Sequence, residues 1–157
     1  MIFEEAKYRF MFAALQEAEK ALEDNEVPVG AIVVKDEKII GRGYNQVERL
    51  KDATAHAEMI ALTAASNNIG NWRLTECSIY VTLEPCIMCT GAMLASRIGE
   101  LYFATSDTKF GACGSVYNLA NEGKTNHKIK VYSGIYSEES RNLLQEFFLK
   151  LKNQKPS

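Results

Sequence analysis

The sequence contains few of the residues that mark specialised structural classes. Only 3 of its 157 residues are proline and 10 are glycine, so collagen-like and Pro- or Gly-rich disordered chains are excluded. Neither sign of charge dominates, because 18 Lys and Arg face 20 Asp and Glu for a net charge of −2. A protein that coats nucleic acid without specificity would be strongly basic. We expect one globular domain over residues 1–157, since a domain usually spans about 100–200 residues.

Long hydrophobic runs are also missing. The longest nearly apolar stretch, residues 27–34, includes Pro28 and Gly30, whereas a membrane-spanning helix needs about 20 apolar residues. The chain begins Met-Ile-Phe-Glu-Glu, which is acidic where a secretory signal would be basic. We therefore expect a cytoplasmic protein with no membrane partner.

Cysteine is scarce, and the chain shows no sign of secretion. The four cysteines are Cys77, Cys86, Cys89 and Cys113. A disulfide framework is typical of short secreted chains, which this sequence does not resemble. The cysteines are therefore expected to bind a metal or to pack in the core.

Charge is distributed unevenly along the chain. The segment from Arg141 to the end carries a net charge of +3, against −5 for the rest. This basic segment either contacts phosphate locally or forms a solvated helix whose cations suit the negative end of its dipole. The charge pattern alone does not decide between the two.

Apolar spacing predicts alternating helices and strands. Residues with helical periodicity or Ala-rich composition alternate with short runs of β-branched and apolar residues. Helices are predicted at residues 4–24, 56–66, 86–97 and 138–152, and strands at residues 29–35, 38–44, 77–83, 101–105 and 129–132. The first two strands read as a hairpin, so the predicted fold is α/β with a mixed central sheet of about five strands flanked by helices.

Two short motifs carry the strongest chemical signal. They are Thr54-Ala55-His56-Ala57-Glu58 and Pro85-Cys86-Ile87-Met88-Cys89. One imidazole and two thiolates match the ligand set of a zinc site that keeps its fourth position for water. Both motifs stand at a predicted helix start, where unpaired N–H groups and the helix dipole favour thiolate over thiol. The pattern predicts one Zn²⁺ bound by His56, Cys86 and Cys89.

Glu58 needs a separate explanation, because it follows His56 by only two residues. On a regular helix the two side chains would point about 200° apart, so His56 is expected at or before the first turn. A carboxylate near a metal-activated water, but not on the metal, can take the water's proton and return it to a leaving group. This arrangement suits hydrolytic removal of an amino group.

The cysteine pair has two other interpretations. A closed structural zinc site would need a fourth ligand from Cys77, Cys113 or His127, and it would leave Glu58 without a role. A redox CxxC motif does not call for an upstream His-x-Glu. Both therefore explain the sequence less completely than a catalytic metal site.

His-x-Glu followed by Pro-Cys-x-x-Cys resembles the signature of zinc-dependent cytidine and nucleobase deaminases. Further stretches narrow the resemblance to bacterial tRNA-specific adenosine deaminases. These are Glu-Val-Pro-Val-Gly-Ala at residues 26–31, Val-Thr-Leu-Glu-Pro-Cys at 81–86 with Gly-Ala-Met at 91–93, and Asp-Thr-Lys-Phe-Gly-Ala-Cys-Gly-Ser at 107–115 with Asn126-His127 downstream. The last loop is the most specific of them, and the similarity runs over nearly the whole chain.

The resemblance implies a three-layer cytidine-deaminase-like fold, a homodimer, and conversion of the wobble adenosine of a tRNA anticodon stem-loop to inosine. It assigns zinc to His56, Cys86 and Cys89, and proton transfer to the catalytic Glu58. The other residues that it implies would bind substrate: Asn45 on the purine, Val29 and the Ala57 backbone as pocket wall and floor, Asp107 and Lys109 on neighbouring nucleotides, and Phe148 on the tRNA.

Without the resemblance, Asn45 would be read as a turn residue, and both Phe147 and Phe148 as core. A free nucleobase or nucleotide deaminase acting on guanine or cytosine, with the same zinc site, is the nearest alternative. A non-catalytic RNA-binding or dimerisation module that keeps zinc for stability is another. The Gly-rich loop with the basic C-terminal helix argues against the first, and the intact Glu58 against the second.

Overall fold

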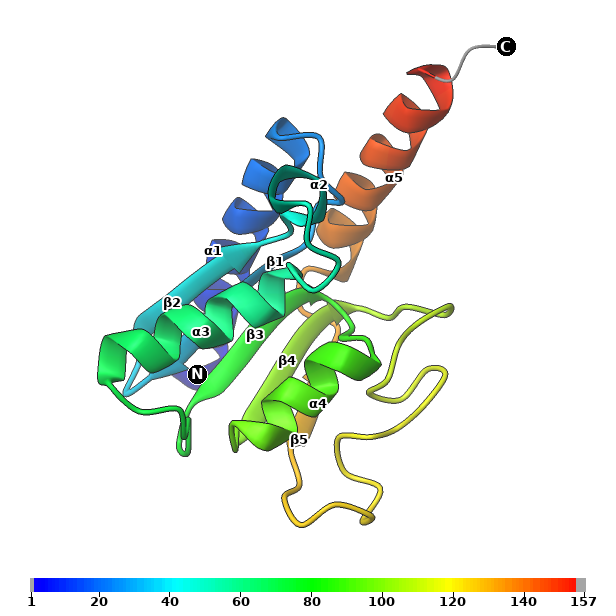
Figure 1. The fold of residues 1–157 in the computed structure, drawn as a ribbon. Coiled ribbons are helices and arrows are strands. Elements are labelled where there is room, and N and C mark those ends of the chain that lie inside the picture. The colour runs from blue at the N-terminus through cyan, green and yellow to red at the C-terminus, as the bar shows by residue number, and fades with distance from the viewer. Residues whose placement is uncertain (1, 155–157) are drawn as a thin grey trace.

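The computed structural model describes the backbone of residues 2–154 and the side chains of residues 4–154. Lys155, part of the predicted basic segment, lies outside the described residues. Over the described range the chain forms an alternating series of helices and strands (Figure 1). In chain order they are α1 Ile2–Glu23, β1 Gly30–Lys35, β2 Lys38–Tyr44, α2 Val47–Leu50, α3 Ala57–Ile69, β3 Ser78–Leu83, α4 Ile87–Ala95, β4 Glu100–Thr105, β5 Lys130–Ser133 and α5 Ser137–Gln154.

The strands form one mixed sheet in the order β2-β1-β3-β4-β5. β1 pairs antiparallel with both β2 and β3, whereas β3–β4 and β4–β5 are parallel. The β1–β2 pair is the predicted hairpin, turning through Asp36 and Glu37, both with positive φ. The parallel pair β3–β4 needs a crossover, and α4 supplies it. The predicted mixed five-stranded α/β sheet is therefore confirmed.

Helices cover both faces of the sheet and make three layers (Figure 1). On the central strands, alternate residues such as Ile79 and Val81 pack against α3 and α4, while Tyr80 packs against α1 on the other face. Strands buried on both faces read as nearly continuous apolar runs, which is why the sequence revealed them so clearly. Within the described residues, no helix combines the length and apolarity needed to cross a membrane.

The observed element boundaries differ from the predicted ones by a few residues. α3 continues to Ile69 and ends where Gly70 adopts a left-handed conformation, with φ of 68°. α4 stops at Ala95, and Arg97 has φ of 67°. The single-turn α2 was not predicted, because four residues are too few to show a helical period.

Close packing of α3 on β2 brings the site together. A Cβ atom on Gly43 would overlap the backbone of Ala57 and Ala61 in α3. Only glycine allows this approach, which sets the beginning of α3 beside the carboxyl end of the sheet. α4 begins at the same end, because it follows β3 directly. Ligand sites in open α/β sheets form at such carboxyl ends.

Candidate active site

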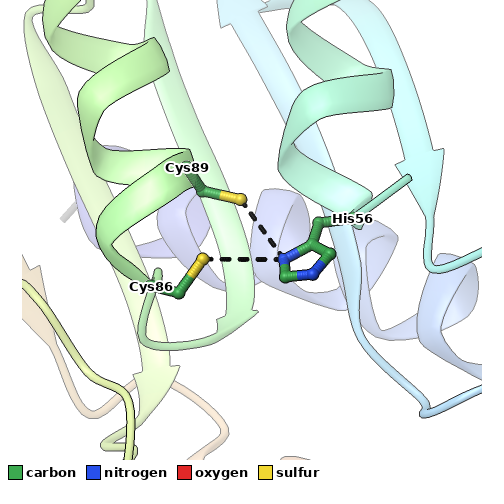
Figure 2. Close-up of side chains that lie close together, drawn as sticks. All are labelled: His56, Cys86 and Cys89. Atoms are coloured by element: carbon green, nitrogen blue, oxygen red, sulfur yellow. Dashed lines mark hydrogen bonds between the residues drawn. The ribbon is translucent and has the colours of Figure 1, made fainter. Parts of the chain in front are cut away.

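Three predicted metal ligands meet where α3 and α4 begin. His56 is the N-cap residue of α3, Cys86 is the N-cap residue of α4, and Cys89 lies in the first turn of α4. Their ligand atoms lie within 4.8 Å of one another. Figure 2 shows both sulfur atoms facing the His56 ring, with Nδ1 3.6 Å from Cys86 Sγ and 3.5 Å from Cys89 Sγ. The N-cap position of His56 agrees with the expectation that it stands at or before the first turn.

The donor set fits Zn²⁺. A hydrogen bond from Cys89 lowers the pKa of Cys86 to about 4, while that same bond and burial raise the pKa of Cys89. The hydrogen bond to Cys86 raises the pKa of His56. The contacts within the cluster therefore favour the thiolate form of Cys86, and a bound cation would favour deprotonation of Cys89 as well, as zinc–thiolate sites require. Two thiolates and a neutral imidazole balance the charge of Zn²⁺.

The candidates for a fourth structural ligand lie elsewhere. Among the described residues, no other His, Cys, Asp or Glu joins the cluster. The Cys77 thiol donates a hydrogen bond to the Thr75 carbonyl, and Cys113 Sγ lies 3.2 Å from Thr90 Oγ1. The His127 ring forms a hydrogen bond with the Ile98 carbonyl through Nε2. Three protein ligands are typical of a catalytic zinc site, and a closed structural site usually has four.

Glu58 is buried beside the cluster, in the first turn of α3. Its side chain is 4% exposed, and burial raises the pKa of Glu58 to about 7. A cation bound by the cluster would lower this pKa, because opposite charge favours the carboxylate. Burial and a bound cation therefore shift the pKa of Glu58 in opposite directions, and its place beside the cluster fits the general acid–base role predicted for it.

One cavity of about 1020 Å³ connects this centre with the predicted substrate residues. His56, Glu58 and Cys86 lie in its lining. So do five of the six predicted substrate-binding residues, namely Val29, Asn45, Asp107, Lys109 and Phe148. The sixth, Ala57, is fully buried and is not part of the lining, so contact through its backbone stays a prediction.

Hydrogen bonds to the backbone hold Asn45 and Asp107 in place at the cavity. Asn45 donates its backbone N–H to the Val29 carbonyl at 3.1 Å, which holds the two neighbours together. Asp107 Oδ1 accepts the backbone N–H groups of Lys109 and Phe110, so this carboxylate shapes the turn that presents Lys109. None of these bonds tests contact with RNA.

Phe147 and Phe148 both border the cavity from α5. The Phe148 side chain is 53% exposed, and its ring packs edge-on against Phe147, with centroids 5.3 Å apart. The expectation from residue type alone, that both rings lie in the core, is wrong for Phe148. Exposure at the mouth of the cavity fits the stacking role that the resemblance implies.

Two buried acids at the cavity were not recognised from the sequence. Both residues belong to motifs quoted above, Glu26 to residues 26–31 and Glu84 to residues 81–86, but the sequence alone assigns a role to neither. Each is 2% exposed and accepts backbone N–H groups from a segment distant in the sequence, which is α2 for Glu26 and the loop after β4 for Glu84. The signal available in the sequence was an acidic residue next to a Pro-containing apolar segment, which is unusual for a solvated acid.

Several known proteins are similar to this chain in sequence. The family model of the cytidine and deoxycytidylate deaminase zinc-binding region matches residues 4–105. The tRNA-specific adenosine deaminase of Aquifex aeolicus is 48% identical over 147 residues, covering 94% of this chain and 97% of that protein. The protein of the same name from Bacillus subtilis is 42% identical over 146 residues, covering 93% and 91%.

Solved structures share its fold. One, from studies of A-to-I editing by tRNA:A34 deaminases at the wobble position of transfer RNA, matches with a TM-score of 0.84 and 41% identity, covering 87% of this chain and 99% of that one. Guanine deaminase from Bacillus subtilis is more distant, with a TM-score of 0.62 and 28% identity over 95% and 96% of the two chains. The chain therefore belongs to the zinc-binding cytidine and deoxycytidylate deaminase family and, within that family, to the tRNA-specific adenosine deaminases.

Proposed function

We propose that this chain hydrolytically deaminates the wobble adenosine of a tRNA anticodon to inosine. One observation carries the proposal: a His-Cys-Cys cluster and a buried carboxylate open into a cavity that reaches the exposed ring of Phe148. The chain is also 42–48% identical, over more than nine-tenths of its length, to relatives named for this activity.

His56, Cys86 and Cys89 would hold Zn²⁺, which would act as a Lewis acid and activate a water for attack on C6 of adenine. Glu58 then handles the protons. It accepts one proton from the attacking water and delivers it to the ring nitrogen N1, and it then moves the remaining proton of the new C6 hydroxyl to the departing amino group. The oxygen of water replaces the amino group, so the products are inosine and ammonia.

The base reaches this centre only after it leaves the anticodon stack. An anticodon loop is single-stranded, so unstacking costs at most a few kcal/mol. In the proposal, Asn45 hydrogen-bonds the purine, and Val29 with the Ala57 backbone shapes the pocket around it. Lys109, with Asp107 shaping its turn, and Phe148 contact the neighbouring nucleotides by charge and by stacking.

The size of the cavity favours an RNA loop over a free base. Its volume of about 1020 Å³ is at the upper end of the usual range for ligand pockets, about 300–1,000 Å³. A single purine would occupy only the inner part, next to Glu58. A free-nucleobase deaminase would have no use for the outer part, which ends at Lys109 and Phe148, and we do not favour that alternative.

The proposal includes a homodimer that acts in the cytoplasm, where tRNA is available. Exposed apolar side chains near the beginning of α4 support pairing, since Ile87, Phe110 and Tyr117 are 51%, 67% and 51% exposed. Light scattering on the purified zinc-loaded protein should give twice the chain mass of 17.5 kDa. A monomer mass at micromolar concentration would rule the homodimer out.

The decisive experiment compares substrates. Zinc-loaded protein is incubated with an anticodon stem-loop that carries adenosine at the wobble position, and in parallel with free adenosine, cytosine and guanine. A stem-loop with guanosine at that position is the matched control. Inosine in the first stem-loop alone is the expected result. Ammonia release from a free base, with both stem-loops unchanged, would overturn the substrate and leave the zinc chemistry intact.

A further inference from the structure

Glu84 is a buried carboxylate without a cation. It lies between β3 and α4, is 2% exposed, and takes part in none of the ion pairs formed by the described residues. An isolated buried charge is costly, so such a group needs hydrogen bonds to every acceptor site. The partners that satisfy Glu84 therefore indicate what it does.

Four donors converge on this one carboxylate, and all come from the loop after β4. Oε1 accepts the backbone N–H of Asp107 at 3.0 Å and the Ser115 hydroxyl. Oε2 accepts the backbone N–H groups of Cys113 and Ser115, both at 3.0 Å. Hydrogen bonds to a charged acceptor are about twice as strong as neutral ones. Glu84 thus ties together both ends of the segment 107–115.

The loop is fitted tightly around Glu84. A Cβ atom on Gly111 would overlap the Glu84 carboxylate, so only glycine fits there. The outward side of the same loop supplies Lys109 and Phe110 to the cavity. Glu84, which itself borders the cavity, therefore fixes one of the cavity walls through these contacts.

Glu26 fixes another wall of the cavity, the one formed by α2. Its side chain, also 2% exposed, accepts the backbone N–H groups of Glu48 at 3.0 Å and Arg49 at 2.7 Å. These groups belong to the first turn of α2, whose own N-cap residue, Gln46, forms no side-chain capping bond. α2 contributes Val47 and Glu48 to the cavity. In Figure 1, α2 and the loop after β4 are separate parts of the molecule.

Glu84 and Glu26 both border the cavity, but neither is a candidate metal ligand, because neither belongs to the metal cluster. A carboxylate offers about four acceptor sites, and the four donors from the loop fill those of Glu84. Its oxygens are therefore committed to the fold although the residue borders the cavity.

We propose that Glu84 and Glu26 are positioning residues that fix two walls of the cleft and so determine how tightly the RNA loop binds, without taking part in the chemical step. The inference rests on the proposed function. It assigns substrate affinity to two buried carboxylates that border the cavity and whose hydrogen bonds hold its walls.

The test of Glu84 uses the full zinc-loaded chain with the variants Glu84→Gln and Gly111→Ala. The first puts an amide donor among N–H donors, and the second adds a Cβ atom that overlaps both the intact carboxylate and the Asp107 carbonyl. Both should raise KM for the stem-loop about tenfold or more, with kcat within about threefold and zinc content unchanged. Ser115→Ala, which removes one of four bonds, should raise KM less. Glu76→Gln, an exposed acid, is the charge control.

Unchanged KM in either folded variant would overturn the proposal, as would a loss confined to kcat. If Glu84→Gln does not fold, Gly111→Ala decides by the same criterion. A wild-type chain that leaves the stem-loop unedited would refute the proposed function, and this inference with it. A result that appears only in the variants bears on the inference alone.

Glu26 allows a rescue experiment. Glu26→Gln should raise KM for the stem-loop, whereas Glu23→Gln, an exposed acid three residues away, should not. Gln46→Asp, added to Glu26→Gln, offers α2 a local N-cap for the same two N–H groups and should restore KM at least in part. Absence of rescue in the folded double variant would show that α2 is not the route by which Glu26 acts.

Discussion

The inner and outer parts of the cleft are built in different ways. At the inner end, His56, Cys86 and Cys89 take their places from two helix starts. Further out, α2 and the segment 107–115 have little regular structure and are held by acids 22 to 31 residues away in the sequence. The inner part depends on short motifs, and the outer part on distant hydrogen bonds.

This difference separates chemistry from recognition. A helix start fixes the geometry of its first residues, so a substitution there changes the reacting centre directly. Walls held by buried hydrogen bonds can shift without disturbing that centre. We therefore expect inner substitutions to abolish turnover, and outer substitutions to weaken binding of the RNA.

The largest effect is expected for Cys86→Ala. Loss of one of three metal ligands should reduce zinc from about one per chain to a small fraction and turnover to the background rate. Metal analysis of the purified variant checks this. Cys77→Ala and Cys113→Ala are the matched controls and should keep their zinc. Loss of metal from either would mean that the site is closed by a fourth cysteine.

Glu58→Gln should have the second-largest effect on turnover. The amide cannot transfer protons, so kcat should fall by about 10²–10⁴-fold, with zinc still bound and affinity for the stem-loop largely kept. Single-turnover kinetics and metal analysis separate these effects. If this variant lost its zinc, Glu58 would be a ligand and its assigned role would be wrong.

Phe148→Ala tests whether the outer part of the cleft binds the RNA. Stacking on an aromatic ring contributes about 1–3 kcal/mol per base, so the dissociation constant of the stem-loop should rise about 5- to 150-fold, with kcat little changed. Leu149→Ala is the matched control, because Leu149 is 61% exposed but is not part of the cavity lining. Equal losses in both variants would point to disturbance of α5 rather than to stacking.

The smallest effect is expected from removing residues 150–157. Three lysines are lost, so binding should weaken modestly, and its dependence on salt should become shallower by up to about two units of log–log slope. Titrations of the labelled stem-loop at several salt concentrations measure this, with zinc content as the check on folding. An unchanged slope would identify the basic segment as a solvated helix end, the other interpretation left open by its charge.

The sequence predicted the fold class and the metal cluster because both depend on local signals. Buried strands such as Ser78–Leu83 are continuous apolar runs, and Gly70 marks a helix end by its left-handed conformation. His-x-Glu and Pro-Cys-x-x-Cys each lie within five residues, so the start of a single helix determines their geometry.

Long-range contacts explain what the sequence did not reveal. The roles of Glu26 and Glu84 depend on loops that come close only after the sheet has formed. α2 has no periodicity of its own and takes its capping bonds from Glu26. The exposure of Phe148 likewise depends on where α5 passes the edge of the cavity, which helical spacing does not determine.

The N-cap positions of α3 and α4 have a consequence for folding. Neither His56 nor Cys86 forms a side-chain capping bond, whereas Ser, Thr, Asp or Asn would stabilise each helix by about 1 kcal/mol. The metal-free chain thus forgoes roughly 2 kcal/mol of capping at the two helices that carry the ligands. An ion that binds only the folded state restores stability by mass action. The availability of zinc therefore influences the amount of folded protein as well as its activity.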